Sequence, residues 1–226
     1  IFSKDATVTY AAIILPVIMF ALTVVAFFLF ARKIFYKKNE LARNIIALVS
    51  TLLFAVVPSI LPRTIAGIPE KESAAFFFIF IGFYFLLEAF TSEKMKRALI
   101  FAFLSGLSTA LLGLISGAVV YVFVTISIAV LFAFLLGKIE KKEFYVFSIW
   151  AIGSMLIAMP FSLGYSLKNL VTSTSTGLAI LVFLILLTDF LIFKKKIFNV
   201  HEKLKKIKLP EQIISIIISI IVIVIL

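Results

Sequence analysis

Long runs of apolar residues alternate with short polar connections along the whole chain. A transmembrane helix needs about 20 predominantly apolar residues to cross ~30 Å of hydrocarbon. The uncharged run 98–137 is about twice that length, so it must turn back on itself, and Ser116-Gly117 is the expected turn. The pattern predicts about eight membrane-spanning helices. Their expected ranges are 10–30, 44–61, 74–90, 98–115, 117–137, 144–163, 177–193 and 210–226.

The composition supports the same fold class. Hydrophobic residues make up 63% of the chain, which contains 26 Phe, and the mean hydropathy is +1.23. These values lie outside the usual range of soluble domains. The chain has no cysteine, which excludes disulfide and thiolate chemistry for these residues. We therefore expect an all-α, polytopic transmembrane helix bundle, with residues 1–226 as a single domain of an integral membrane protein.

The net charge of +11 follows the connections between the predicted spans. Of the 22 Lys and Arg residues, only Lys4, Arg63, Lys71 and Lys168 lie in the N-terminal segment or the even-numbered connections. Because cytoplasmic loops carry most basic residues, both chain ends and the segment 61–73 are expected on the outer face of the cell membrane. The basic excess is then topological, with some attraction to anionic membrane lipids, and we expect no nucleic-acid partner.

The segment 61–73 is a polar interruption between two long apolar runs. Glu70 and Glu72 supply hard oxygen ligands of the kind that Mg²⁺ or Mn²⁺ prefers. Arg63 can orient a carboxylate or bind a phosphate with two hydrogen bonds. A structural alternative is equally good on local chemistry. Pro69 is well placed as the first residue of the third helix, and the helix dipole favours acids in a first turn by about 0.3 to 1 kcal/mol.

Two further acidic residues lie within spans, about one helical turn from the inner end. Glu88 is close to the basic connection that contains Lys94, and Asp189 is close to Lys194. Side chains at that depth reach the interface, so we predict structural pairing for both acids rather than proton transfer. Trp150 lies within the sixth predicted span, where we expect a packing role.

The stretch 56–77, VVPSILPRTIAGIPEKESAAFF, resembles the second outer loop of the oligosaccharyltransferase catalytic subunit. The family pattern is a proline, then Arg-Ser/Thr-x-Ala/Ser-Gly, then an acidic-x-acidic pair that enters an apolar helix. Further similarity follows in the same order along the chain. It comprises Ser116-Gly117-Ala118 with Tyr121-Val122-Phe123, then Met159-Pro160-Phe161 with Gly164, and a Ser/Thr cluster before Gly177.

The resemblance implies a metal-dependent glycosyltransferase for protein N-glycosylation. Members of this family transfer a glycan from a polyprenyl phosphate or diphosphate carrier to the Asn of an Asn-x-Ser/Thr sequon. It places Glu70 and Glu72 in the acidic pair that holds or surrounds Mg²⁺ or Mn²⁺, with Arg63 beside them, and it gives Arg63 and Glu72 the catalytic roles. The implied partners are a lipid-linked oligosaccharide donor and an acceptor polypeptide.

The chain departs from the family pattern at two places and lacks three parts of the family's site. Glu70 stands where the family usually has Asp, and no aromatic residue accompanies the turn at Ile115-Ser116. The missing parts are the acidic motif of the first outer loop, the glutamate of a later outer loop, and the Trp-Trp-Asp-Tyr-Gly motif of a soluble domain. We expect the first to precede Ile1 and the others to follow Leu226. The chain alone should then be an inactive fragment.

Two alternative functions stay open on the sequence. The first is another membrane glycosyltransferase that uses a polyprenyl phosphate donor and a sugar or lipid acceptor. The second is a transporter or flippase, which is suggested by Pro16 and Pro160 within spans and by the polar outer loop 164–176.

Overall fold

The structure, a computed structural model, describes residues 8–68, 70–161, 165–195 and 210–225. Within these ranges every regular element is a helix, as the sequence predicts. The elements are α1 (Val8–Ile34), α2 (Glu40–Ala55), η1 (Leu61–Arg63), α3 (Glu72–Thr91), α4 (Met95–Ile115), α5 (Val119–Leu135), α6 (Lys141–Ala158), η2 (Met159–Phe161), α7 (Leu167–Thr172), α8 (Thr174–Asp189), η4 (Phe190–Lys194) and α10 (Glu211–Ile225).

The helices match the predicted spans in position but not all in length. Among the described residues, 5 helices are long and apolar enough to cross a membrane: those at Tyr10–Ile34, Glu72–Thr91, Met95–Ile115, Lys141–Phe161 and Thr176–Lys194. The apolar helices Val119–Leu135 and Glu211–Ile221 are shorter. The helix α2 has 16 residues because the chain turns after Ala55 instead of continuing to Leu61. An integral membrane protein is therefore supported, and the predicted number of about eight spans is not confirmed.

The predicted reversal near Ser116-Gly117 is confirmed. The helix α4 ends at Ile115 and α5 begins at Val119. Ser116 has extended backbone angles, φ −146° and ψ 143°, and its hydroxyl accepts a hydrogen bond of 3.3 Å from the backbone N–H of Ala118. This side-chain bond satisfies one backbone donor at the start of α5.

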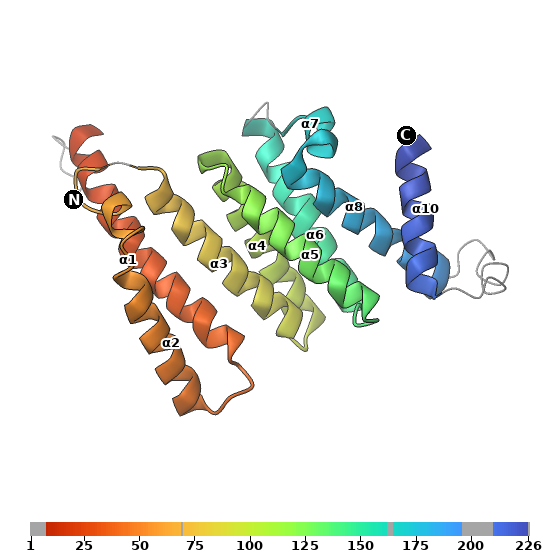
Figure 1. Cartoon of the computed structure of the whole chain (residues 1–226), viewed down its shortest axis with the longest axis horizontal. Helices are drawn as coiled ribbons and strands as arrows, with labels where there is room; N and C mark the ends of the chain where they lie inside the picture. The colour runs from red at the N-terminus through yellow and green to blue at the C-terminus, as the bar shows by residue number, and fades with distance from the viewer. Residues whose placement is uncertain (1–7, 69, 162–164, 196–209, 226) are drawn as a thin grey trace.

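The helices form a bundle that runs from α2 to α10 (Figure 1). The helix α1 packs against α2 and α3, α3 against α4, α4 against α6, α5 against α8, and α8 against α10. The α1–α2, α3–α4 and α5–α6 connections lie at the lower end in Figure 1, whereas η1 and the α4–α5 turn lie at the upper end. These three described connections, which are rich in Lys and Arg, therefore share one end of the bundle, as the charge pattern requires.

Close packing of α4 on α6 forms part of the core. Trp150 is fully buried and donates a hydrogen bond of 3.0 Å from Nε1 to Oγ1 of Thr109. A Cβ atom added at Gly106 would lie 3.1 Å from the backbone oxygen of Trp150, so the two helix backbones approach each other closely at this glycine. Small residues at helix contacts are typical of membrane proteins, in which packing rather than water exclusion holds helices together. This environment agrees with the packing role expected for Trp150.

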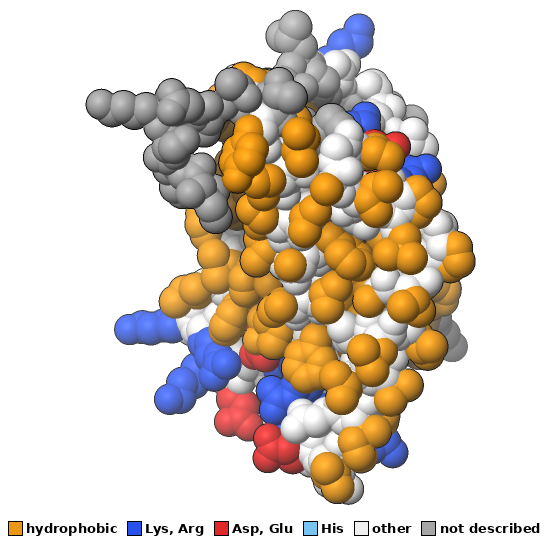
Figure 2. Space-filling view, turned by 90° about the vertical axis from the view of Figure 1, so that its left-hand side faces the viewer, with side chains coloured by type: hydrophobic (Ala, Val, Ile, Leu, Met, Phe, Trp, Pro, Cys, Tyr) orange, Lys and Arg blue, Asp and Glu red, His pale blue; other side chains and the backbone are white. Residues whose placement is uncertain are grey.

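The face formed by α1 and α2 is apolar in the middle and charged toward its ends (Figure 2). On α2, exposed apolar side chains recur on one side of the helix, with exposed fractions of 72% for Leu41, 54% for Leu48 and 61% for Leu52. An apolar surface of this kind is suited to contact with lipid chains.

Tyr165 lies in the connection before α7, and its ring covers Gly113 near the end of α4, where an added Cβ would collide with the phenol. Burial raises the pKa of the Tyr165 phenol above its usual value because it disfavours the phenolate. The stability that the neutral phenol contributes is complete below about pH 10 and is lost as the pH rises through the raised folded-state pKa. We expect Tyr165→Phe to flatten the alkaline decline of the melting temperature. Parallel melting curves for the two proteins across the alkaline range would contradict this assignment.

Candidate functional site

The chain leaves α2 through a tight turn that presents Arg63. Leu61–Arg63 forms a short 3₁₀ helix, and Thr64 follows it with only 4% of its surface exposed. The Thr64 hydroxyl donates to the backbone oxygens of Ile60 and Leu61, at 3.2 and 3.1 Å. These local bonds join Thr64, which follows Arg63, to residues that precede Arg63, and so they fix the backbone that carries the Arg63 side chain.

Gly67 lets the chain reverse toward the start of α3. Its φ of +85° lies in the left-handed region, which residues with a Cβ rarely adopt. Its backbone N–H donates a hydrogen bond of 3.4 Å to the backbone oxygen of Ile13 in α1. The segment is therefore attached to a spanning helix rather than projecting freely, and the positive φ explains why glycine suits this position.

The reversal brings Arg63 and Glu70 together. Arg63 Nε lies 3.8 Å from Glu70 Oε2, and the two side chains are 50% and 43% exposed. An ion pair this exposed contributes about 0 to 1 kcal/mol to stability. The sequence raised the possibility that Arg63 orients a carboxylate, and the contact agrees with it. Both groups also keep enough exposure to bind a ligand from solution.

Glu72 is the first residue of α3, where the helix dipole favours a negative charge. This start is later than the expected one at Pro69, a residue that lies outside the described residues. The buried Ser73 closes the turn, because its hydroxyl and N–H both donate to the backbone oxygen of Glu70, at 2.8 and 3.3 Å. Glu72 is half-buried, and it forms no ion pair with any residue that the structure describes. Its carboxylate is therefore available to a cation.

The carboxylates of Glu70 and Glu72 suit a divalent cation by donor type but not by number. Mg²⁺ and Mn²⁺ prefer carboxylate and water oxygens, usually in an octahedral arrangement. No group of three or more His, Cys, Asp or Glu that could hold a metal ion is found in the described part of the chain. These residues supply at most part of a ligand set.

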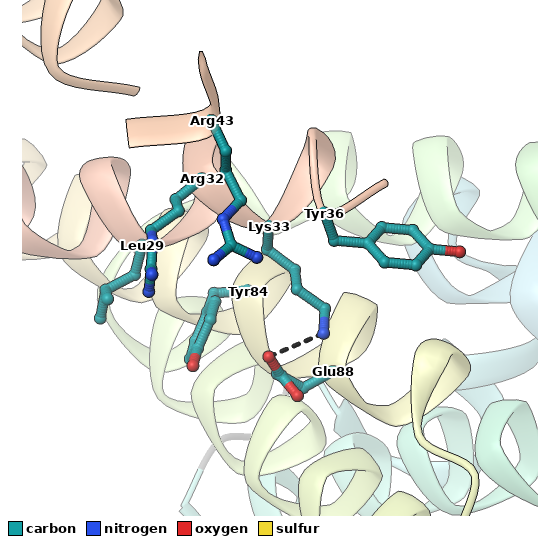
Figure 3. A pocket seen from close by; sticks show the side chains of 7 residues that line it. All are labelled: Leu29, Arg32, Lys33, Tyr36, Arg43, Tyr84 and Glu88. Carbon is teal, nitrogen blue, oxygen red and sulfur yellow. Dashed lines mark ion pairs between the residues drawn. The ribbon is translucent and has the colours of Figure 1, made fainter. Parts of the chain in front are cut away.

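A second charged cluster lies at the other end of α3. Glu88 pairs with Lys33 of α1 at 2.8 Å and with Arg97 of α4 at 3.4 Å. Pairing of Glu88 was expected, but the nearest predicted partner, Lys94, is not the one observed. The contact with Lys33 depends on the packing of α1 against α3, which no local pattern shows. A cavity of about 100 Å³ adjoins this pair (Figure 3).

Asp189 interacts electrostatically with Lys194, as expected, and it also bonds to a helix distant in sequence. Its carboxylate accepts a hydrogen bond of 3.3 Å from the Ser215 hydroxyl, and Ser219 bonds to Thr188 at 3.0 Å. Both bonds join α8 to α10. Asp189 thus contributes to helix packing, which agrees with a structural role, although the partner comes from a helix distant in sequence.

Comparison with known proteins identifies the family. A family model described as oligosaccharyl transferase STT3, N-terminal, matches residues 1–225. The chain belongs to this family. The resemblance at residues 56–77 is thus confirmed by a match over the whole chain, and membership of the oligosaccharyltransferase family disfavours the transporter and flippase hypothesis.

The fold of this STT3-family chain is similar to that of a solved archaeal protein. The crystal structure of the Archaeoglobus fulgidus oligosaccharyltransferase, a complex with Zn and sulfate, matches with a TM-score of 0.67 and 19% sequence identity. The match covers 95% of this chain and 28% of the archaeal chain. At this identity the likeness concerns the fold. No curated protein matches the sequence.

Proposed function

We propose that this chain forms part of an oligosaccharyltransferase for protein N-glycosylation. The enzyme transfers a glycan from a polyprenyl phosphate or diphosphate carrier to the Asn of an Asn-x-Ser/Thr sequon. The family match over residues 1–225 carries this proposal. The geometry supports it, because the one polar loop with the family motif folds back so that Arg63 meets Glu70 beside Glu72.

The proposed roles of the three residues follow from the chemistry of the reaction. An amide nitrogen is a poor nucleophile, so carboxylates must engage its N–H groups as it attacks the sugar. Glu72 has a free carboxylate for this task, and Glu70 and Glu72 together would hold Mg²⁺ or Mn²⁺. When bound, the cation offsets the negative charge on the departing phosphate. Arg63 adds a second positive charge that can hold a phosphate oxygen. The archaeal crystal structure is a complex with Zn, which supports a role for a divalent cation.

The glycan donor and the acceptor polypeptide approach this loop from different sides, one from the bilayer and the other from water. The positive-inside pattern supports an outer-face position in the cell membrane for the Arg63 end of the bundle. A lipid-linked oligosaccharide can reach the loop along the bilayer, and a translocated polypeptide can reach it from solution. The remaining ligands and the sequon-reading group come from outside this chain, so residues 1–226 alone are expected to be inactive.

Metal removal tests the proposal in the full-length enzyme. We expect a chelator to abolish glycosylation of a sequon peptide by a lipid-linked oligosaccharide, because the carboxylates alone cannot offset the leaving-group charge. Added Mg²⁺ or Mn²⁺ should restore it, as measured by mass spectrometry of the glycopeptide. A peptide with Gln in place of the sequon Asn is the control. Full activity without metal would contradict the metal role, and transfer only to sugar or lipid acceptors would favour the other polyprenyl-phosphate glycosyltransferase.

A further inference from the structure

Four cations from three helices gather at the basic end of the bundle. Arg32 and Lys33 end α1, Arg43 lies in the first turns of α2, and Arg97 begins α4. Figure 3 shows Lys33 and Arg43 extending toward the same space above Tyr84 and Glu88. The cavity of about 100 Å³ at this place is also lined by Arg32, Leu29 and Tyr36.

The cluster holds more positive than negative charge. Lys33 and Arg97 share Glu88, whereas Arg32 and Arg43 share Glu40 at 3.2 and 3.6 Å. Glu40 is 74% exposed, so its two pairs are largely screened by water. Four cations thus face two carboxylates, of which only Glu88 is well buried. Such an arrangement has a deficit of negative charge that an external anion can supply.

Arg43 leaves one hydrogen-bond donor unused within the protein. Its Nε atom is buried and has no hydrogen-bond partner among the described residues, although the whole side chain is 24% exposed. By contrast, Arg32 Nε donates to Asn44 Oδ1 at 2.7 Å. The Arg43 side chain also lines the cavity, where its other N–H groups can donate to an external acceptor.

The apolar surface beside the cavity indicates what kind of anion fits. Leu29 lines the cavity, and Leu22 and Val25, which lie on the same side of α1, are 42% and 57% exposed. Figure 2 shows hydrophobic side chains over the middle of the face that α1 and α2 form. A basic pocket between transmembrane helices at the cytoplasmic boundary is the usual setting for recognition of anionic headgroups.

We propose that Arg32, Lys33 and Arg43 bind the headgroup phosphate of an anionic phospholipid from the leaflet at the basic end. The acyl chains lie along the exposed apolar side of α1 that continues from Leu29, and the Arg43 guanidinium donates to the phosphate from the wall of the cavity. The site is distinct from the Arg63–Glu70 loop at the opposite end of α3, and it does not depend on the proposed glycan transfer.

Lipid retention by the full-length protein tests this site. We expect native mass spectrometry of the protein from phosphatidylglycerol nanodiscs to show one tightly retained lipid, and from phosphatidylcholine nanodiscs none. Arg43→Gln should lower the affinity for the retained lipid about fivefold, since one basic residue near a membrane surface contributes about that factor to binding. Arg43→Lys keeps the charge and should retain most of the binding. Lys96→Gln, which removes an exposed charge at the same end of the bundle, should have little effect.

Several outcomes would overturn the proposal. Equal weakening by Lys96→Gln would mean that only diffuse charge attracts the lipid. Equal retention of phosphatidylcholine would mean that the negative headgroup is not selected. Stabilisation by inorganic phosphate that matches phosphatidylglycerol in melting temperature would indicate a free-anion pocket instead. If Arg43→Gln does not fold, Arg32→Gln gives the second test, and unchanged lipid retention by that variant would equally overturn the site.

Discussion

Glu70→Gln and Glu72→Gln in the full-length enzyme should each lower glycopeptide formation by about 10² to 10³-fold, with membrane insertion unchanged. Loss of one preorganised electrostatic group in an active site typically has an effect of this size. Gln keeps the shape of the side chain but removes the charge that a cation and an attacking amide both require. The Arg63–Glu70 pair is exposed and contributes little to folding, so the loss should appear in turnover and not in stability.

Matched variants separate the charge effect from a general one. Glu93→Gln makes the same change at an exposed position beyond the opposite end of α3, and it should leave turnover at the wild-type level. Glu70→Asp introduces the acid that the family usually has at this position and should retain most activity. Turnover should be measured with saturating donor and peptide over a range of metal concentrations. Wild-type turnover by both Gln variants would refute the assigned roles.

Trp150→Ala should lower the free energy of unfolding of the bundle by about 3 kcal/mol. Trp150 has the largest fully buried side chain among the described residues. It packs against Phe123 and Phe147 and bonds to Thr109 across the α4–α6 contact. Since lipid is as apolar as the core, the loss arises from missing packing contacts and the lost hydrogen bond to Thr109 rather than from water exposure.

An exposed residue on the same helix provides the control for this prediction. Ile152 lies on α6 with 41% of its surface exposed. Ile152→Ala should change the stability by less than about 1 kcal/mol, because its side chain can be replaced by lipid. Thermal or denaturant unfolding in the same detergent gives the change in the free energy of unfolding for both variants. Equal losses for the two would show that Trp150 has no special packing role.

Local sequence patterns predicted the elements of this fold well. Hydropathy located a helix in each of the eight expected ranges, and the excessive length of the run 98–137 predicted the turn at Ser116. These predictions succeed because span length and charge bias depend on a few tens of neighbouring residues and on the bilayer. The lengths were predicted less well. Helix α2 stops at Ala55, where hydropathy continues but the backbone turns toward Leu61–Arg63.

The candidate site was likewise predicted only in part. The motif in 56–77 identified Arg63, Glu70 and Glu72, but the roles assigned to them remain predictions. Their arrangement required the fold, because the Arg63–Glu70 contact depends on the reversal at Gly67 and its attachment to Ile13. The sequence also gave no sign that Lys33 would neutralise Glu88.

The sequence by itself determined that this is a helical membrane protein, which end of its helices carries the positive charge, and which loop carries the family motif. Tertiary structure alone decided the partners: Lys33 with Glu88, Ser215 with Asp189, and Arg43 beside a cavity with an unused donor. The physical reason is the range of the interactions. Hydropathy and charge bias act along neighbouring residues, whereas ion pairs and hydrogen bonds join side chains only when helix packing brings them within about 4 Å.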